Sequence, residues 1–180
     1  MKTLFRCLAP AVLLFASTAH AEMYIGGATG DGNYEITEQG IPFKAEDSGS
    51  KGFVGFRKGR FFAIEGGYLD LEDLDSTVGS TSLTVDVTGW DLFLVLVLPL
   101  TRRTEVFAKG GALAWETESI FSDGMTIAPP VEADGTDFAY AVGIGYLIGK
   151  HFSVRVEQEY FEIEGTDKVK FTSLGLEIRF

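Results

Sequence analysis

The sequence has 180 residues, one cysteine and a formal net charge of −11 at pH 7. Such an acidic chain is a poor binder of nucleic acid, because neutralising phosphates requires clustered Lys and Arg side chains. With one cysteine the chain forms no internal disulfide, so burial or a bilayer must hold the fold together.

Residues 1–21 have the layout of a secretory signal peptide. Lys2 and Arg6 precede an apolar run at residues 8–16, and small residues follow at Ala19 and Ala21. The apolar run is too short to span a bilayer as a helix. We therefore predict cleavage after Ala21, which leaves a cysteine-free domain of residues 22–180.

Alternating polar and apolar segments, bounded by turn residues, fill the rest of the chain and predict eight β-strands. These strands are expected at 23–30, 48–57, 60–70, 82–100, 105–117, 136–149, 152–164 and 169–180. Tight turns alternate with longer connections, which we predict as loops at 31–47, 71–81, 118–135 and 165–168. The pattern predicts an all-β fold, an eight-stranded antiparallel up-and-down transmembrane β-barrel.

Charge is divided between the two ends of this predicted barrel. The loops carry half of the acidic residues, whereas the tight-turn end carries Arg57, Lys58, Arg60, Arg102, Arg103 and Lys150. Short turns of such barrels lie in the periplasm and long loops lie outside the cell. We therefore expect basic periplasmic turns and acidic extracellular loops.

The alternation leaves two environments open. A soluble barrel would turn the apolar faces inward and the charged faces outward, and a membrane barrel does the reverse. Gly and Ala opposite the bulky residues of 136–149 suit a narrow interior, which favours the membrane. Aromatic residues near both ends of the apolar face also predict membrane girdles: Tyr68, Trp90 and Tyr140 toward the loops, and Phe56, Phe152 and Phe180 toward the turns.

In a membrane barrel, seven charged residues would face the interior. They are Glu65, Asp91, Lys109, Arg155, Glu157, Glu177 and Arg179. Charges removed from water must pair, so these residues predict a network that links several strands. We favour a structural core of ion pairs over an ion path, and we expect Lys109→Met or Arg155→Met to lower the resistance to unfolding.

The segment 174–180, LGLEIRF, places Leu174, Leu176, Ile178 and Phe180 on one face. It resembles the C-terminal signal by which bacterial outer-membrane proteins are recognised for insertion. Segments 60–73 and 95–116 resemble strands of the small OmpA/OmpX-type, opacity-like barrels. The resemblance implies an outer-membrane location, insertion by the barrel-assembly machinery and a monomer with a polar plug. It also implies a non-enzymatic role, strengthening the membrane and contacting lipopolysaccharide (LPS), host or neighbouring proteins through the loops.

Candidate chemistry is sparse. His151 is the single histidine after the predicted signal peptide, whereas most nucleophilic catalytic sites and zinc sites need further His or Cys side chains. His151 and Ser153 have the His-x-Ser spacing of lipid A deacylases, and we expect both to point inward at the turn end. Acidic runs at 47–51 and 72–76 offer oxygen ligands to divalent cations, but neither has the EF-hand spacing.

We therefore predict no enzyme activity, no metal site and no cofactor. The alternative function is a narrow ion-conducting porin, and a lipid A-modifying enzyme ranks below it. The main prediction is a surface-interaction barrel.

Overall fold

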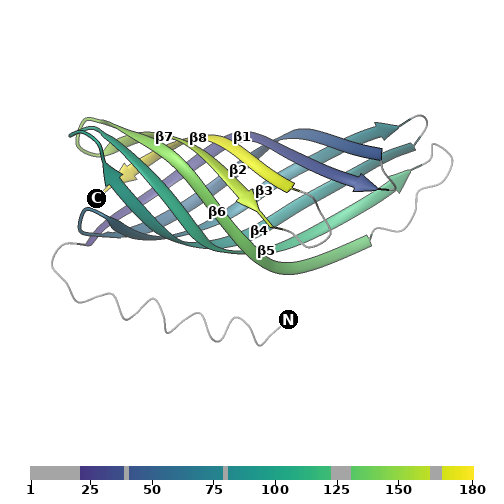
Figure 1. The fold of residues 1–180 in the computed structure, drawn as a ribbon, viewed down its shortest axis with the longest axis horizontal. Helices are drawn as coiled ribbons and strands as arrows, with labels where there is room; N and C mark the ends of the chain where they lie inside the picture. The colour runs from purple at the N-terminus through teal and green to yellow at the C-terminus, as the bar shows by residue number, and fades with distance from the viewer. Residues whose placement is uncertain (1–20, 39–40, 79–80, 123–130, 163–167) are drawn as a thin grey trace.

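The structure is a computed structural model that describes residues 21–38, 41–78, 81–122, 131–162 and 168–180. These residues form a closed antiparallel barrel in which β1 pairs with β8 (Figure 1). The strands are β1 (Ala21–Glu38), β2 (Ile41–Lys58), β3 (Phe62–Val78), β4 (Thr81–Pro99), β5 (Thr104–Ser122), β6 (Val131–Ile148), β7 (Phe152–Phe161) and β8 (Lys168–Arg179). The predicted fold class is confirmed. In the described ranges, no helix is long and apolar enough to cross a membrane. Residues 1–20 of the predicted signal peptide lie outside those ranges.

Three tight turns lie at one end of the barrel, which we call the turn end. Gly59 and Gly149 have φ values of +69° and +84°, in the left-handed region that glycine adopts without steric cost. In the third turn the Thr101 hydroxyl accepts hydrogen bonds from the backbone N–H groups of Arg103 and Thr104, at 3.1 and 2.9 Å. The opposite end, which we call the hairpin end, carries the β1–β2, β3–β4, β5–β6 and β7–β8 connections.

The strands continue into segments that the sequence had predicted as loops. β1 and β2 stay in register from Asp31↔Ser48 to Glu38↔Ile41, across the predicted loop 31–47. β3, β5 and β6 also extend into predicted loops, β4 lies within one residue of its predicted bounds, and β7 stops at Phe161 instead of 164. A hairpin outside the bilayer can pair its backbone groups without burying either face, so it needs no alternation of side chains. The loop boundaries were therefore wrong.

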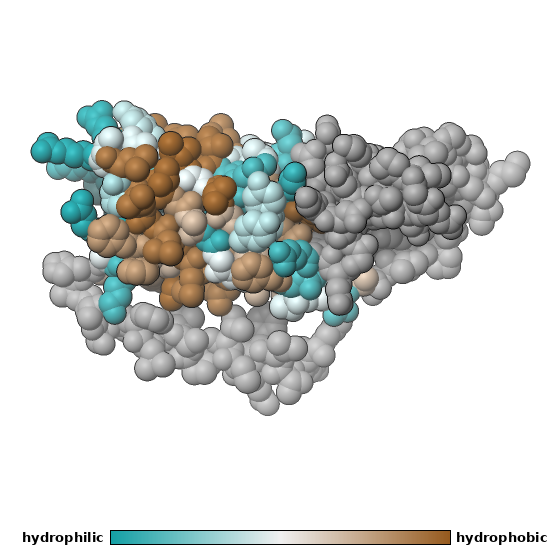
Figure 2. Space-filling model, viewed as in Figure 1, coloured by the Kyte–Doolittle hydropathy of each residue, from teal (hydrophilic) through white to brown (hydrophobic). Residues whose placement is uncertain are grey.

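A band of exposed apolar side chains surrounds the barrel near the turn end (Figure 2). Along β4 every second residue from Trp90 to Leu98 is exposed, and Leu100 continues the row. This row covers roughly 33 Å at about 3.3 Å per residue, which a tilt of about 40° reduces to about 25 Å, the height of a membrane barrel's apolar band.

Aromatic rings border this band at both ends, as predicted. At the border of the band that faces the hairpin end, the ring centroids of Tyr68 and Trp90 lie 4.9 Å apart, and Tyr140 stacks on Tyr160 at the same distance. At the turn end the exposed phenylalanine rings are those of Phe56, Phe61, Phe62, Phe152 and Phe180.

The rings of Tyr68, Trp90, Tyr140 and Tyr160, which we call the girdle, separate two sections of the barrel. In the membrane section, toward the turns, outward side chains are apolar and the interior contains charges and phenylalanine rings. In the outer section, beyond Tyr68 and Trp90, the outward side chains of β8 are Thr172 and Lys170, and the inward ones are apolar. Seven buried side chains form what we call the apolar plug of this section: Leu69, Leu71, Val87, Leu113, Phe161, Val169 and Phe171.

Candidate functional site: the charged barrel interior

The seven charged residues predicted for the interior are all buried inside the barrel. They arise from β3, β4, β5, β7 and β8, each on the strand face opposite the exposed apolar residues. The structure adds Lys51, Arg57, Glu105 and Glu159 to them. The ion pairs divide these residues into three clusters, stacked from the turn end to the hairpin end.

The central cluster consists of Glu65, Lys109, Arg155 and Glu157. Glu65 accepts two hydrogen bonds from the Arg155 guanidinium, at 2.8 and 3.0 Å, and one from Lys109 at 2.6 Å. The Tyr24 hydroxyl donates a further bond of 2.9 Å to the same carboxylate. Glu157 contacts Lys109 at 2.6 Å and Arg155 at 3.2 Å. Two acids thus balance two bases, which offsets the cost of removing four charges from water.

The inner cluster lies at the turn end and consists of Arg57, Glu105, Glu177 and Arg179. Glu105 pairs with Arg57 at 3.0 Å and with Arg179 at 2.5 Å. Glu177 pairs with Arg179 and lies 3.8 Å from Arg155, which connects this cluster to the central one. The Arg57 guanidinium also donates to the carbonyl oxygen of Arg60, so the cluster is tied to a tight turn.

The outer cluster consists of Lys51, Asp91 and Glu159. Lys51 pairs with Asp91 at 2.8 Å and also with Glu159. All three side chains are at most 1% exposed. The apolar plug begins beside this cluster, where Leu69 pairs with Lys51 in the β2–β3 register, and continues beyond it, where Phe161 follows Glu159 by two residues on β7.

Phenylalanine rings fill the space between the clusters. The Phe93 ring is fully buried, and both Lys51 and Lys109 lie over it, at 5.1 and 5.7 Å from its centroid. The Arg155 guanidinium stacks on the Phe53 ring at 3.4 Å. Cations held against aromatic faces gain electrostatic stabilisation that survives removal from water. The rings therefore hold the ammonium and guanidinium groups in place and also occupy the lumen.

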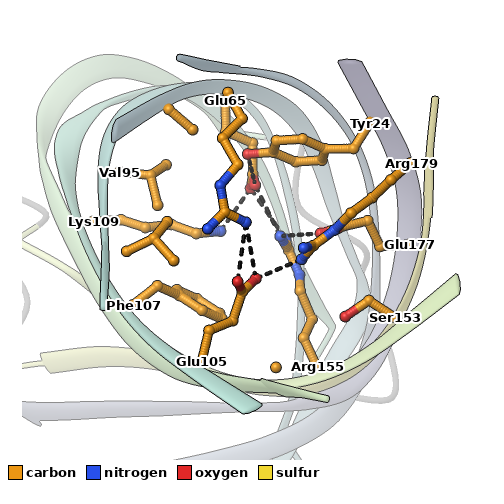
Figure 3. Close-up of a pocket in the computed structure, with 14 residues that line it drawn as sticks. Tyr24, Glu65, Val95, Glu105, Phe107, Lys109, Ser153, Arg155, Glu177 and Arg179 are labelled. Carbon is orange, nitrogen blue, oxygen red and sulfur yellow. Dashed lines mark hydrogen bonds and ion pairs between the residues drawn. The ribbon is translucent and has the colours of Figure 1, made fainter. Parts of the chain in front are cut away.

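A small pocket lies between the inner and central clusters (Figure 3). Its volume of about 30 Å³ gives room for about two water molecules. The Ser153 hydroxyl lines the pocket and has no hydrogen-bond partner among the described residues. The pocket is therefore suited to water at the turn end of the interior, and it is far too small for an organic ligand.

Strand alternation could have identified the interior residues that the sequence analysis missed. Lys51 shares a parity with Phe53 and Arg57, and Glu159 follows Glu157 by two residues. Glu105 likewise precedes Lys109 by four residues on β5. Arg57 had been assigned to the basic turn, although its side chain points back into the barrel and pairs with Glu105. All four residues lie within the predicted strands, so their parity was available, and the sequence analysis did not extend the interior assignment to them.

The expected His151–Ser153 pair is not formed on one face. Ser153 is buried in the interior, but His151 is exposed, with its Nδ1 atom 3.1 Å from the carbonyl oxygen of Arg179. His151 belongs to the turn that follows Gly149, where the alternation of a strand does not apply. The prediction that both residues point inward was wrong for His151.

The two acidic runs cannot be placed as metal sites. The side chains of 72–76 and of Asp47 lie outside the described residues, and Lys51 of the other run belongs to the outer cluster. In the part of the chain that the structure describes, no group of three or more His, Cys, Asp or Glu side chains is arranged to hold a metal ion.

The closed barrel, its apolar band and its ion-paired interior define an eight-stranded β-barrel of the outer-membrane type. The chain matches the family described as outer membrane protein beta-barrel domain over residues 7–180, and it belongs to this family. Membership places the protein in the outer membrane. No curated protein matches the sequence.

Solved structures with the same fold include proteins of several bacteria. Ail, the attachment invasion locus protein of Yersinia pestis, was solved in complex with the heparin analogue sucrose octasulfate. It has a TM-score of 0.63 and 15% identity, and the match covers 90% of this chain and 100% of Ail. Neisserial surface protein A has a TM-score of 0.64 and 10% identity, and the match covers 90% of this chain and 100% of that protein. The N-terminal barrel domain of Pseudomonas aeruginosa OprF has a TM-score of 0.56 and 10% identity, and the match covers 89% of this chain and 96% of that domain. At these identities the likeness establishes the fold alone.

Proposed function

We propose that this protein is a non-enzymatic, non-conducting barrel that strengthens the outer membrane and presents its outer section to partners at the cell surface. The observation that carries the proposal is the filled interior. Three ion-paired clusters, several phenylalanine rings and the apolar plug follow one another along the lumen.

The filled interior argues against the narrow pore. A permeating ion would have to separate carboxylates from cations that are both removed from water, and breaking a buried pair costs about 3–5 kcal/mol. It would then have to cross the apolar plug, which offers no ligand to replace the water shell of the ion. The small pocket beside Ser153 admits water at the turn end but does not continue through the plug.

The outer section supplies the proposed contact surface. Its described exposed residues include Asp31, Glu116, Asp134 and Glu162, so this surface is acidic. Such a surface repels polyanions of the kind bound in the Ail complex. We propose that it contacts LPS phosphates through bridging divalent cations, or a cationic surface ligand.

The remaining parts of the proposal concern export and assembly. Residues 1–21 direct export to the periplasm, and the barrel-assembly machinery recognises the apolar face of Leu174, Leu176, Ile178 and Phe180. These four side chains are exposed to lipid on β8 and at its end. The barrel then acts as a monomer.

Planar-bilayer recording tests the proposal. The refolded barrel, shown to be closed by a heat-dependent gel shift, is expected to be electrically silent at all salt concentrations. Discrete, salt-dependent conductance of the same sample would overturn the structural role of the interior and would establish the narrow pore.

A further inference from the structure

The turn end carries exposed cations that the proposed function does not use. We call them the basic ring: Lys58, Arg60, Arg102, Arg103 and Lys150. Lys58 ends β2, and the others occupy the β2–β3, β4–β5 and β6–β7 connections, which alternate around this end of the closed barrel with the ends of β8 and β1 at the fourth position. The teal rim at the left of Figure 2 is this hydrophilic edge, next to the brown apolar band.

The basic ring has no internal counter-charge in the described part of the chain. The nearest acids in the interior, Glu105 and Glu177, are already paired with Arg57 and Arg179. No ion pair of a basic-ring residue occurs within the described ranges, and the remaining acidic side chain of this rim there is that of the half-buried Glu22. A polypeptide with a net charge of −11 therefore concentrates unpaired positive charge at one end.

The depth of the basic ring matches phospholipid headgroups. Arg60 directly precedes the exposed Phe61, Arg102 follows the exposed Leu100 by two residues, and Lys150 lies between the exposed Ile148 and Phe152. At about 3.3 Å per residue, these three cations start within roughly 7 Å of a side chain that faces hydrocarbon. The headgroup layer occupies about 5–8 Å on each side of the hydrocarbon core, and long basic side chains reach toward it.

We propose that the basic ring binds the anionic phospholipid headgroups of the periplasmic leaflet, and that these contacts fix the depth and polarity of the barrel in the membrane. A soluble polyanion would satisfy the cations but would gain nothing from the apolar residues interleaved with them. An anionic phospholipid satisfies both, because its phosphate meets the cations while its acyl chains cover Phe61, Leu100 and Phe152. Cations near such a surface are attracted to it, with a strength that salt reduces.

The test measures how phosphatidylglycerol changes the equilibrium constant for unfolding in urea. The barrel is refolded in phosphatidylcholine vesicles with and without phosphatidylglycerol. The heat-dependent gel shift then measures the fraction of folded protein. For the unmodified protein in low salt, phosphatidylglycerol is expected to lower the unfolding constant by about tenfold or more, and high salt is expected to reduce this effect. In the variant with all five basic-ring residues replaced by Gln, the effect of phosphatidylglycerol is expected to disappear.

A matched control removes five charges from the other end, through Asp31→Asn, Asp70→Asn, Glu116→Gln, Asp134→Asn and Glu162→Gln. This control is expected to keep the full effect of phosphatidylglycerol. Inorganic phosphate, added to phosphatidylcholine vesicles, is expected to leave the unfolding constant unchanged. Equal effects of phosphatidylglycerol on the unmodified protein and on the Gln variant would overturn the proposal. So would an effect that high salt leaves intact in the unmodified protein, or one that phosphate alone reproduces.

Discussion

The membrane section and the outer section are built from the same strands but bury opposite kinds of side chain. On β3, Ile64 faces outward and Glu65 inward in the membrane section, whereas Asp70 faces outward and Leu69 inward beyond the girdle. The alternation runs through the boundary without interruption, but the polarity of the two faces is exchanged. The barrel is a membrane protein over one part of its length and resembles a soluble barrel over the other.

The difference shows that the surroundings decide which face of a strand is apolar. In the bilayer, outward apolar side chains meet hydrocarbon, and the interior can hold charges provided that they pair. In water the outward face must be polar, so the hydrophobic effect drives the apolar side chains inward. The two sections are therefore stabilised by different interactions, and substitutions can separate them.

The largest expected effect comes from breaking the central cluster. Arg155→Met removes two hydrogen bonds to Glu65 and an ion pair to Glu157, and we expect it to lower the free energy of unfolding by about 3–5 kcal/mol. Urea unfolding in phosphatidylcholine vesicles measures the loss. The same substitution at the exposed Arg102 is the control, with an expected change of about 0.5 kcal/mol or less. Equal losses at both positions would contradict a structural role for the interior charges.

The next effect concerns the apolar plug. Leu69 is 1% exposed, and Leu69→Ala is expected to cost about 3 kcal/mol through lost burial and the cavity left behind. Leu100→Ala, at an exposed position of the turn end, is the matched substitution and should cost about 1 kcal/mol or less. An equally small loss in the free energy of unfolding for Leu69→Ala, in the same urea titration, would show that water fills the interior of the outer section.

The position of the boundary is tested by lysine substitutions on one face of β8. Leu176→Lys puts a charge into hydrocarbon and is expected to cost about 2–3 kcal/mol. Thr172→Lys lies on the same face, four residues closer to the hairpin end, and should change stability by about 0.5 kcal/mol or less. A similar cost at both positions would move the boundary of the membrane beyond Thr172.

The smallest effect is expected at the girdle itself. Tyr68 and Trp90 are in ring contact across the β3–β4 pair, and a double-mutant cycle with alanine should give a coupling free energy of about 1 kcal/mol. If the loss in the double variant equals the sum of the two single losses, the ring contact contributes nothing beyond the burial of each side chain.

Several features of the interior could be predicted from the sequence, because they depend on alternation within one strand. Glu177 and Arg179 were assigned to the face opposite Leu176 and Ile178, and the structure places them there. The partners of these charges could not be predicted. The contact of Arg155 with Glu65 joins β7 to β3 across the lumen, and no local pattern encodes a pairing between residues 90 positions apart.

The ends of the strands were the weakest part of the prediction. The signals for the loop 31–47 were polar composition and turn-forming residues, both of which a hairpin in water also shows. The structure continues the ladder to Glu38↔Ile41, because paired neighbours already hold the two backbones in register. A separate omission left Lys51 and Glu105 out of the interior and counted Arg57 with the turn, although all three lie inside predicted strands.

The amino-acid sequence by itself determined the number of strands, their antiparallel order, the apolar and polar face of each strand in the membrane section, and the segregation of basic residues to one end. These properties follow from the period of two and from short-range turn chemistry. The tertiary structure alone decided which charges pair, how far the hairpins extend and where the polarity of the faces is exchanged. Alternation is identical on both sides of that exchange, so its meaning depends on what surrounds the closed barrel at each height.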